Sequence, residues 1–175
     1  ATNYHNLGLI YQEEGKYEKA KELYEKSLWI YERVLGENHP DTATSYHNLA
    51  KVYKEKGKYE KAKELYKKSL WIYERVLGKN HPNTATSYHN LAGVYEEEGK
   101  YEKAKELYEK SLWIYERVLG ENHPNTAISY HNLGFVYQKE GEYGKAKEYY
   151  EKSLRILEQV LGKNHPNTAT SYHNL

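Results

Sequence analysis

Hydrophobic residues recur along the chain at the spacing of buried helical faces, and glycine and proline separate the periodic stretches. In the stretch that begins at Pro40, the apolar positions fall on one side of a helix: Ala43, Tyr46, Leu49, Ala50 and Tyr53. Pro40 suits the first turn because its φ is already helical and its missing N–H costs nothing there. The pattern predicts a helix from Pro40 to about Lys56, ended by Gly57.

A second periodic stretch follows and predicts a helix from about Lys58 to Leu77, ended by Gly78. The residues expected on its buried face are Tyr59, Ala62, Tyr66, Ser69, Leu70, Tyr73, Val76 and Leu77. Charged pairs four residues apart, such as Glu64 and Lys68, lie on the opposite side. A short linker then leads to Pro82, where the next first helix is expected to begin.

This two-helix pattern returns every 42 residues. The tetrapeptide Tyr-His-Asn-Leu marks the register, beginning at Tyr4, Tyr46, Tyr88, Tyr130 and Tyr172. The repeats are 1–42, 43–84, 85–126 and 127–168, with a partial repeat at 169–175, and together they are expected to form one domain over residues 1–175. Helix pairs of this kind cannot bury their faces alone, so they stack on one another. The sequence predicts an all-α solenoid of tandem helix–turn–helix repeats.

The composition narrows the possible functions. Lys and Arg total 26 against 25 Asp and Glu, which argues against the basic surface that a nucleic acid or an anionic membrane requires. The chain has no cysteine, which excludes disulfides and fits a cytoplasmic protein. No apolar run approaches the roughly 18 residues of a membrane span. No enzyme and no cofactor are expected, because the single aspartate, Asp41, lies at a linker and each His and Ser recurs between repeats.

The order of small and aromatic residues resembles the tetratricopeptide repeat signature. The residues that carry the resemblance are Tyr46, Leu49, Ala50, Tyr53, Gly57, Tyr59, Ala62 and Tyr66. The usual unit has about 34 residues, and the longer unit with its VLG-x-N-H-P-x-T-A linker is similar to the repeats of kinesin light chains and of NTPase-linked sensor proteins. The resemblance covers the whole chain. It implies a right-handed superhelix whose first helices line a concave groove that holds an extended peptide.

Mapped onto this chain, the groove falls at repeat positions 2, 5, 6, 9, 12 and 13, and helical spacing independently aligns Thr44, His47, Lys51 and Lys54. Positions 9 and 12 differ among otherwise similar repeats, which favours a surface diversified to recognise a ligand; neutral drift of exposed residues is the alternative. The expected groove residues are His5, Asn6, Leu9, Gln12, Thr44, His47, Asn48, Lys51, Lys54, His89, Asn90, Glu96, Ile128, His131, Asn132, Phe135 and Gln138. Lys51 and Lys54 would favour an acidic ligand residue, and Ile128 and Phe135 an apolar one.

The histidines at position 5 are expected to be polar groove residues that make binding sensitive to pH. A metal site is not expected, because equivalent residues on stacked helices lie about 10 Å apart and metal–ligand bonds are about 2 Å long. Asparagine at position 6 offers both a donor and an acceptor to a peptide backbone. The histidines that precede Pro, at His39, His81, His123 and His165, are explained by the turn into the next helix.

Three tryptophans, Trp29, Trp71 and Trp113, each lie four residues before an arginine on the charged side of the second helix. Local stacking of Trp on Arg is one interpretation, and an outer interface is the other. The end helices suggest head-to-tail self-association, since Tyr172 and Leu175 lack a covering second helix. The functional prediction is a non-catalytic scaffold for a protein or peptide; the alternative is an engineered or purely structural array without a ligand.

Overall fold

The computed structural model describes residues 1–162 and contains only helices and turns in that range. The helices are α1 (Thr2–Glu13), α2 (Tyr17–Val34), α3 (Pro40–Glu55), α4 (Tyr59–Val76), α5 (Pro82–Glu97), α6 (Tyr101–Val118), α7 (Pro124–Lys139) and α8 (Tyr143–Leu161). Odd-numbered helices are the first helices of the repeats and even-numbered ones the second. The predicted boundaries of the second repeat agree with α3 and α4 to within one residue.

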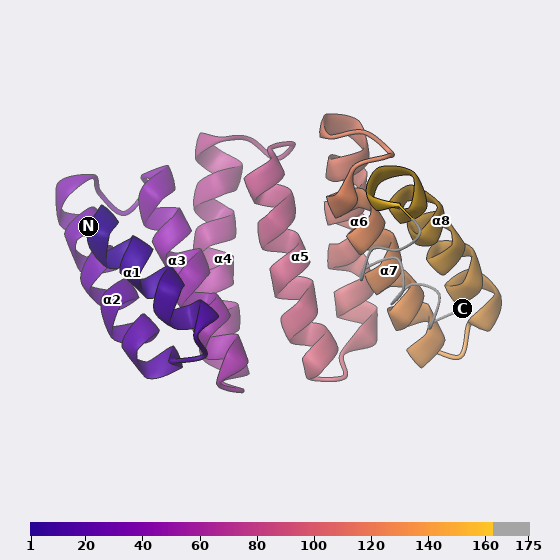
Figure 1. Cartoon of the computed structure of the whole chain (residues 1–175). Helices are drawn as coiled ribbons and strands as arrows, with labels where there is room; N and C mark the ends of the chain where they lie inside the picture. The colour runs from indigo at the N-terminus through magenta and orange to yellow at the C-terminus, as the bar shows by residue number, and fades with distance from the viewer. Residues whose placement is uncertain (163–175) are drawn as a thin grey trace. The chain divides into compact units, whose positions relative to one another are not determined.

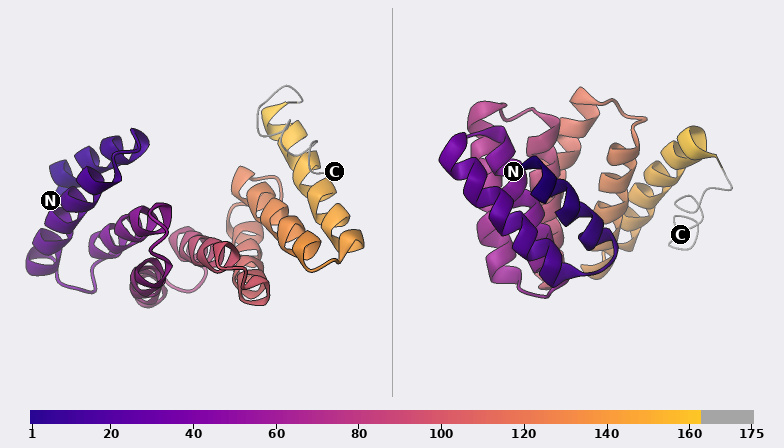
Figure 2. Two further views of the ribbon diagram at one scale, coloured as in Figure 1. Left: turned by 90° about the horizontal axis from the view of Figure 1, so that it is seen from below. Right: turned by 60° about the vertical axis from the view of Figure 1, so that its left-hand side comes forward.

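The chain divides into two compact units, Ala1–Val94 and Tyr95–Leu175, with the division inside α5. In the first unit, α1 packs on α2, α2 on α3, and α3 on α4 (Figures 1 and 2). In the second unit, α6 packs on α7 and α7 on α8 (Figure 1). The pairs α1–α2, α3–α4 and α7–α8 are hairpins, and α2 and α6 each also contact the first helix of the following repeat. None of the helices within residues 1–162 is both long and apolar enough to cross a membrane.

Each hairpin turn is closed by glycine. Gly57 has φ +66°, a left-handed conformation that costs glycine little. The N–H of Gly57 donates to the carbonyl of Lys54 at 2.8 Å, and the N–H of Lys58 donates to that of Tyr53 at 2.9 Å. These bonds satisfy carbonyls that the end of α3 would leave unpaired. Gly57 therefore ends the first helix as predicted.

The linker between repeats is fixed by its histidine and threonine. His81 Nδ1 accepts a hydrogen bond from the N–H of Asn83 at 3.1 Å, so the ring caps the start of α5. The Thr84 hydroxyl donates to the Gly78 carbonyl at 2.9 Å. The same two bonds recur at His39 and Thr42 and at His123 and Thr126. The prediction that these histidines serve the helix-entry turn is confirmed; His165 lies outside the described residues.

The core consists of buried tyrosines fitted against small residues. Tyr66 is 1% exposed, and Ala62 and Ser69 on the same helix are fully buried. The predicted buried face of the second helix is wrong at Val76, which is 48% exposed, and it left out Ile72, which is buried. Ile72 packs with Tyr46, and Leu28 of α2 covers the same cluster. The second helix is buried by two neighbours, so its buried arc is wider than a single stripe.

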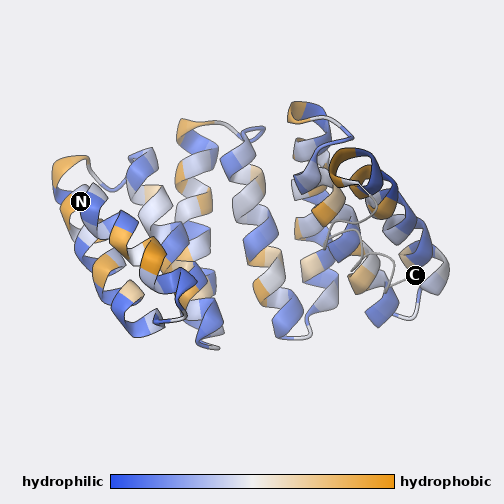
Figure 3. Cartoon of the chain, viewed as in Figure 1, coloured by the Kyte–Doolittle hydropathy of each residue, from blue (hydrophilic) through white to orange (hydrophobic). Residues whose placement is uncertain are grey.

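Figure 3 shows hydrophilic residues along most of the ribbon, with hydrophobic residues at intervals within the helices. Helix α1 is different, because apolar residues are exposed along it: Tyr4, Leu7, Leu9 and Ile10. The equivalents of Tyr4 and Leu7 in α3, Tyr46 and Leu49, are buried where α2 packs on α3. Helix α1 thus exposes a side that α3 buries.

Candidate functional site

Successive first helices are joined by hydrogen bonds between histidine and asparagine. Asn48 Nδ2 on α3 lies 3.2 Å from His5 Nε2 on α1, and Asn90 Nδ2 on α5 lies 2.8 Å from His47 Nε2 on α3. Because an amide NH₂ only donates, Nε2 accepts and the ring proton belongs on Nδ1. The predicted histidine and asparagine positions are therefore brought together, but they bind each other. We call this row the histidine–asparagine ladder.

The histidines at position 5 of the repeats are held neutral. Burial lowers the pKa of His47 to about 4, and the charge of Lys51 adds to that shift. Burial lowers the pKa of His89 to about 4 in the same way, with Lys54 adding to it. Burial also lowers the pKa of His131 and that of His5, where Asp41 opposes the shift. Each ring is neutral at pH 7, so charge recognition at position 5 is excluded at that pH.

The ladder rings also pack against the tyrosines of the core. The His47 ring meets the Tyr66 ring edge-on with centroids 5.2 Å apart, and the His5 and Tyr24 rings do so at 5.6 Å. The buried Nδ1 of His47 has no hydrogen-bond partner within the described residues. A protonated ring would therefore bury an unpaired N–H beside the charge of Lys51, which agrees with the depressed pKa.

Position 12 is tied to the second helix of its own repeat. Gln12 Oε1 accepts a hydrogen bond from the Tyr24 hydroxyl at 3.0 Å. Glu96 accepts from Tyr108 at 2.8 Å and Gln138 from Tyr150 at 3.1 Å. These contacts give three of the variable residues a structural role that the sequence reasoning missed. The available signal was the tyrosine that always follows 12 residues later.

Position 9 lies at a pocket between the first two repeats. A pocket of about 260 Å³ is lined by Leu9, Gln12 and Glu13 of α1, Tyr17 of α2, and Lys51 and Glu55 of α3. We call it the first-helix pocket. Three predicted groove residues, Leu9, Gln12 and Lys51, therefore converge from two repeats. Glu13 and Glu55 occupy position 13, which was also mapped to the groove, whereas Tyr17 was not anticipated.

The remaining predicted groove residues have different surroundings. The Thr44 hydroxyl lies 3.0 Å from the Pro40 carbonyl and 2.7 Å from the Tyr73 hydroxyl, so it is engaged within its repeat. Asn6 is exposed. In the second unit Ile128 is 41% exposed, and Phe135 packs on the Tyr137 and Tyr150 cluster.

Lys54 of α3 is half-buried. Asn132 of α7 engages the Tyr108 hydroxyl within the second unit. Thr44 and Asn132 thus make contacts inside the fold, and Asn6 and Ile128 face solvent.

The opposite side of the helices carries a second set of links between repeats. The Tyr46 hydroxyl donates to Glu32 Oε1 of the preceding repeat at 2.5 Å. Tyr88 donates to Glu74 and Tyr130 to Glu116 in the same way. Burial, followed by the bond to Glu32, raises the pKa of Tyr46 above its ordinary value, so the phenol stays protonated. We call these contacts the tyrosine–glutamate links.

The tryptophans lie on this second-helix side. Each stacks with an arginine, which was one of the two interpretations of their spacing. The guanidinium carbon of Arg75 is 4.6 Å from the Trp71 ring, and the corresponding distances for Arg33 on Trp29 and Arg117 on Trp113 are both 4.7 Å. Trp71 and Trp113 are nevertheless 47% exposed and Trp29 58%. Local stacking holds the rings without covering them.

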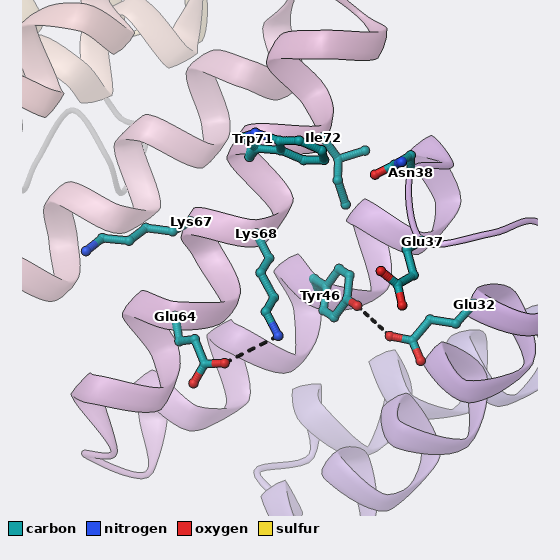
Figure 4. A pocket seen from close by; sticks show the side chains of 9 residues that line it. All are labelled: Glu32, Glu37, Asn38, Tyr46, Glu64, Lys67, Lys68, Trp71 and Ile72. Atoms are coloured by element: carbon teal, nitrogen blue, oxygen red, sulfur yellow. Dashed lines mark hydrogen bonds and ion pairs between the residues drawn. The ribbon is translucent and has the colours of Figure 1, made fainter.

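A larger pocket of about 590 Å³ opens beside Trp71 (Figure 4). Its lining comes from three elements: Glu32, Glu37 and Asn38 at the end of α2 and in the following linker, Tyr46 of α3, and Glu64, Lys67, Lys68, Trp71 and Ile72 of α4. Lys68 is paired with Glu64 at 3.3 Å. We call this the tryptophan pocket. Within residues 1–162, no group of three or more His, Cys, Asp or Glu side chains is arranged to hold a metal ion.

Comparison with known proteins bears on the whole chain. The family model of the tetratricopeptide repeat matches residues 1–75, 55–117, 91–159 and 129–175. A search of curated proteins finds no match. Among solved structures, the nearly identical TPR-like repeats of a Podosopora anserina protein described as a kinesin light chain are 32% identical, with a TM-score of 0.84 over 99% of this chain and 82% of that one.

Two further structures are similar. BtubC (BKLC) from P. vanneervenii is 29% identical, with a TM-score of 0.83 over 93% of this chain and 65% of that one. The apo form of RapI shares the fold, with a TM-score of 0.79 and 21% identity over 98% of this chain and 46% of that one. The predicted all-α solenoid and the kinesin-light-chain-like character of the repeats are confirmed. The chain belongs to the tetratricopeptide repeat family.

Proposed function

We propose that the chain is a non-catalytic scaffold that binds a protein or an extended peptide segment at its first-helix face. Tetratricopeptide repeats commonly serve protein–protein interaction, and this family membership supports the general role. The observation that carries the specific proposal is the first-helix pocket, where Leu9, Gln12 and Lys51 converge from α1 and α3.

The lining of this pocket indicates the ligand. Leu9 is 39% exposed and supplies apolar surface, while exposed Lys51 supplies a positive charge. An extended segment with an apolar residue next to an acidic one fits these two groups. Glu13 and Glu55 line the same pocket and disfavour a second acidic side chain. Because the histidines at position 5 are neutral, Lys51 and Lys54 are the basic groove residues that would recognise an acidic side chain of the ligand.

A peptide-array screen followed by affinity measurement tests the proposal. Wild type is expected to select peptides with an apolar–acidic pair, and Lys51→Glu together with Lys54→Glu is expected to weaken the best peptide by about tenfold, or about 1.4 kcal/mol. Lys19→Glu, an equal charge reversal on α2, is the control and should have little effect. Equal losses in the two variants would contradict the proposal. Selection of no peptide would favour the alternative of a structural or engineered array without a dedicated ligand.

We also propose that α1 takes part in self-association. Its Tyr4, Leu7 and Ile10 are 42%, 41% and 52% exposed, whereas Tyr46 and Leu49 of α3 are buried next to α2. A second helix from another copy would cover α1 as α2 covers α3. The other half of the prediction, Tyr172 and Leu175, lies outside the described residues. Analytical ultracentrifugation over a concentration series should show association that Ile10→Glu reduces, and a strictly monomeric chain would contradict it.

A further inference from the structure

The tryptophan pocket combines an apolar wall with carboxylates at one end. Trp71 and Ile72 form the wall, and Figure 4 shows the carboxylates of Glu32 and Glu37 beside the Tyr46 hydroxyl at the opposite side. Glu32 holds that hydroxyl through Oε1. Its second oxygen and the carboxylate of exposed Glu37 remain as acceptors for an incoming donor.

The basic residues of the lining leave this acidic end uncompensated. Lys68 is paired with Glu64 at 3.3 Å and lies over the Tyr46 ring at 5.6 Å. Figure 4 shows Lys67 extending away from Glu32 and Glu37. Arg75 lies on the Trp71 ring but does not line the pocket. The charge at the Glu32 and Glu37 end is therefore negative.

From this arrangement we propose that the tryptophan pocket receives an arginine side chain of a partner protein. The planar guanidinium offers five N–H donors in a fixed fork and can serve two carboxylates at once. Its methylene stem would lie along Trp71 and Ile72, which suits an amphipathic side chain. Because Arg75 already occupies the Trp71 ring, the incoming guanidinium is assigned to the carboxylates and not to that ring.

The other repeats lack this combination in sequence. The position of Glu37 is Lys79 in the second repeat and Glu121 in the third, and the position of Trp71 is Trp113 in the third repeat and Arg155 in the fourth. The pocket combines the linker residue of one repeat with the tryptophan position of the next. In the later repeats Lys79 is followed by Trp113, and Glu121 is followed by Arg155. Of these three combinations, Glu37 with Trp71 is the one that joins an acid to a tryptophan. The pocket around Tyr4 and Trp29 has no linker carboxylate in its lining. A single docking point within the repeats is expected.

Titration of the ¹⁵N-labelled chain with an acetylated, amidated Gly-Arg-Gly peptide tests this proposal. The indole N–H of Trp71 and the backbone amide of Asn38 should shift in a saturable manner, while the same peptide with citrulline, which is neutral and similar in shape, should shift them far less. Glu37→Lys, which copies Lys79, should weaken binding by about fivefold or more. Trp71→Arg, which copies Arg155, should abolish the response of the Asn38 amide.

Two matched variants separate this site from other causes. Glu121→Lys makes the same charge reversal at the equivalent linker position and should leave the titration unchanged. Lys51→Glu alters the first-helix pocket and should also leave the titration unchanged. The test of the arginine site therefore does not depend on whether the first-helix pocket binds a peptide. Equal shifts with the citrulline peptide, or full binding by folded Glu37→Lys, would overturn the proposal.

Discussion

The two faces of the helix layers link successive repeats in different ways. On the first-helix face, neutral His47 and Asn90 share a bond, and burial and nearby Lys51 lower the pKa of the ring. On the second-helix face, the neutral Tyr46 hydroxyl donates to charged Glu32. The first link contains a ring whose pKa is lowered to about 4, so it is lost when acid protonates the histidine. The second contains a phenol whose pKa is raised, so its donor proton is kept. The same helices are thus held by two sets of contacts that differ in their response to acid.

The largest expected effect comes from protonating the buried histidines at position 5. A folded-state pKa of about 4 for His47 and His89, below the ordinary 6.5, means that the unfolded chain binds more protons between these values. Stability is therefore full above about pH 6.5 and is lost as the pH falls toward 4, by roughly 3 kcal/mol per ring. Urea unfolding across this range measures it. The double variant His47→Asn, His89→Asn should flatten the pH dependence, and an unchanged slope would show that the ladder is not its source.

Removing a tyrosine–glutamate link should have the next largest effect. Tyr46→Phe leaves Glu32 without its donor and should lower the free energy of unfolding by about 1–2 kcal/mol, independent of pH between 6 and 8. Tyr53→Phe is the control, because its bond to Glu25 is longer, at 3.4 Å. Chemical denaturation of both variants checks the order. A greater loss for Tyr53→Phe would contradict the importance assigned to the short link.

The tryptophan–arginine stack should contribute less. Arg75→Gln removes the cation over the Trp71 ring and should cost about 0.5–1 kcal/mol at this half-exposed site. Arg155→Gln is the matched control, since Arg155 itself replaces the tryptophan in the fourth repeat. Thermal unfolding with tryptophan fluorescence measures both. Equal costs would indicate a helix-charge effect common to the two arginines instead of stacking.

The smallest effect on stability is expected at the variable position of the first-helix face. Lys51→Glu changes an exposed side chain and should alter the free energy of unfolding by no more than about 0.5 kcal/mol at pH 7. Because the Lys51 charge lowers the pKa of His47, the variant should raise that pKa. An NMR pH titration of the His47 ring measures the shift. A large loss of stability would mean that position 9 supports the fold, which would weaken its assignment to ligand recognition.

Much of the fold could be predicted because its determinants are local. The spacing of Tyr46 and Tyr53, the proline at Pro40 and the glycine at Gly57 define a helix and its ends without reference to distant residues. The error at Ile72 and Val76 arose where burial depends on a neighbouring repeat. Periodicity indicates that a face is buried but not how many helices cover it.

The candidate site was less predictable, because its side chains choose among several partners. His47 was expected to face a ligand and instead binds Asn90, a residue 43 positions away. Gln12 and Gln138 were expected at the groove and bond the tyrosines of their own repeats. Lys51 and Leu9 line a pocket, and their role in binding stays a prediction. Variation between repeats singled out positions 9 and 12 alike, although position 12 bonds within its own repeat.

The ladder also has a genetic consequence. Helix α3 carries both halves of the contact: His47 accepts from Asn90 of the following repeat, and Asn48 donates to His5 of the preceding one. The same His-Asn pair stands at positions 5 and 6 of each repeat in the sequence. Recombination that adds or removes 42 residues therefore still places an asparagine donor opposite a histidine acceptor at the new junction between repeats. Deletion of residues 43–84 would place Asn90 opposite His5 with the flanking Tyr-His-Asn-Leu sequence unchanged. Array length can thus change in single steps without a second mutation to repair the junction.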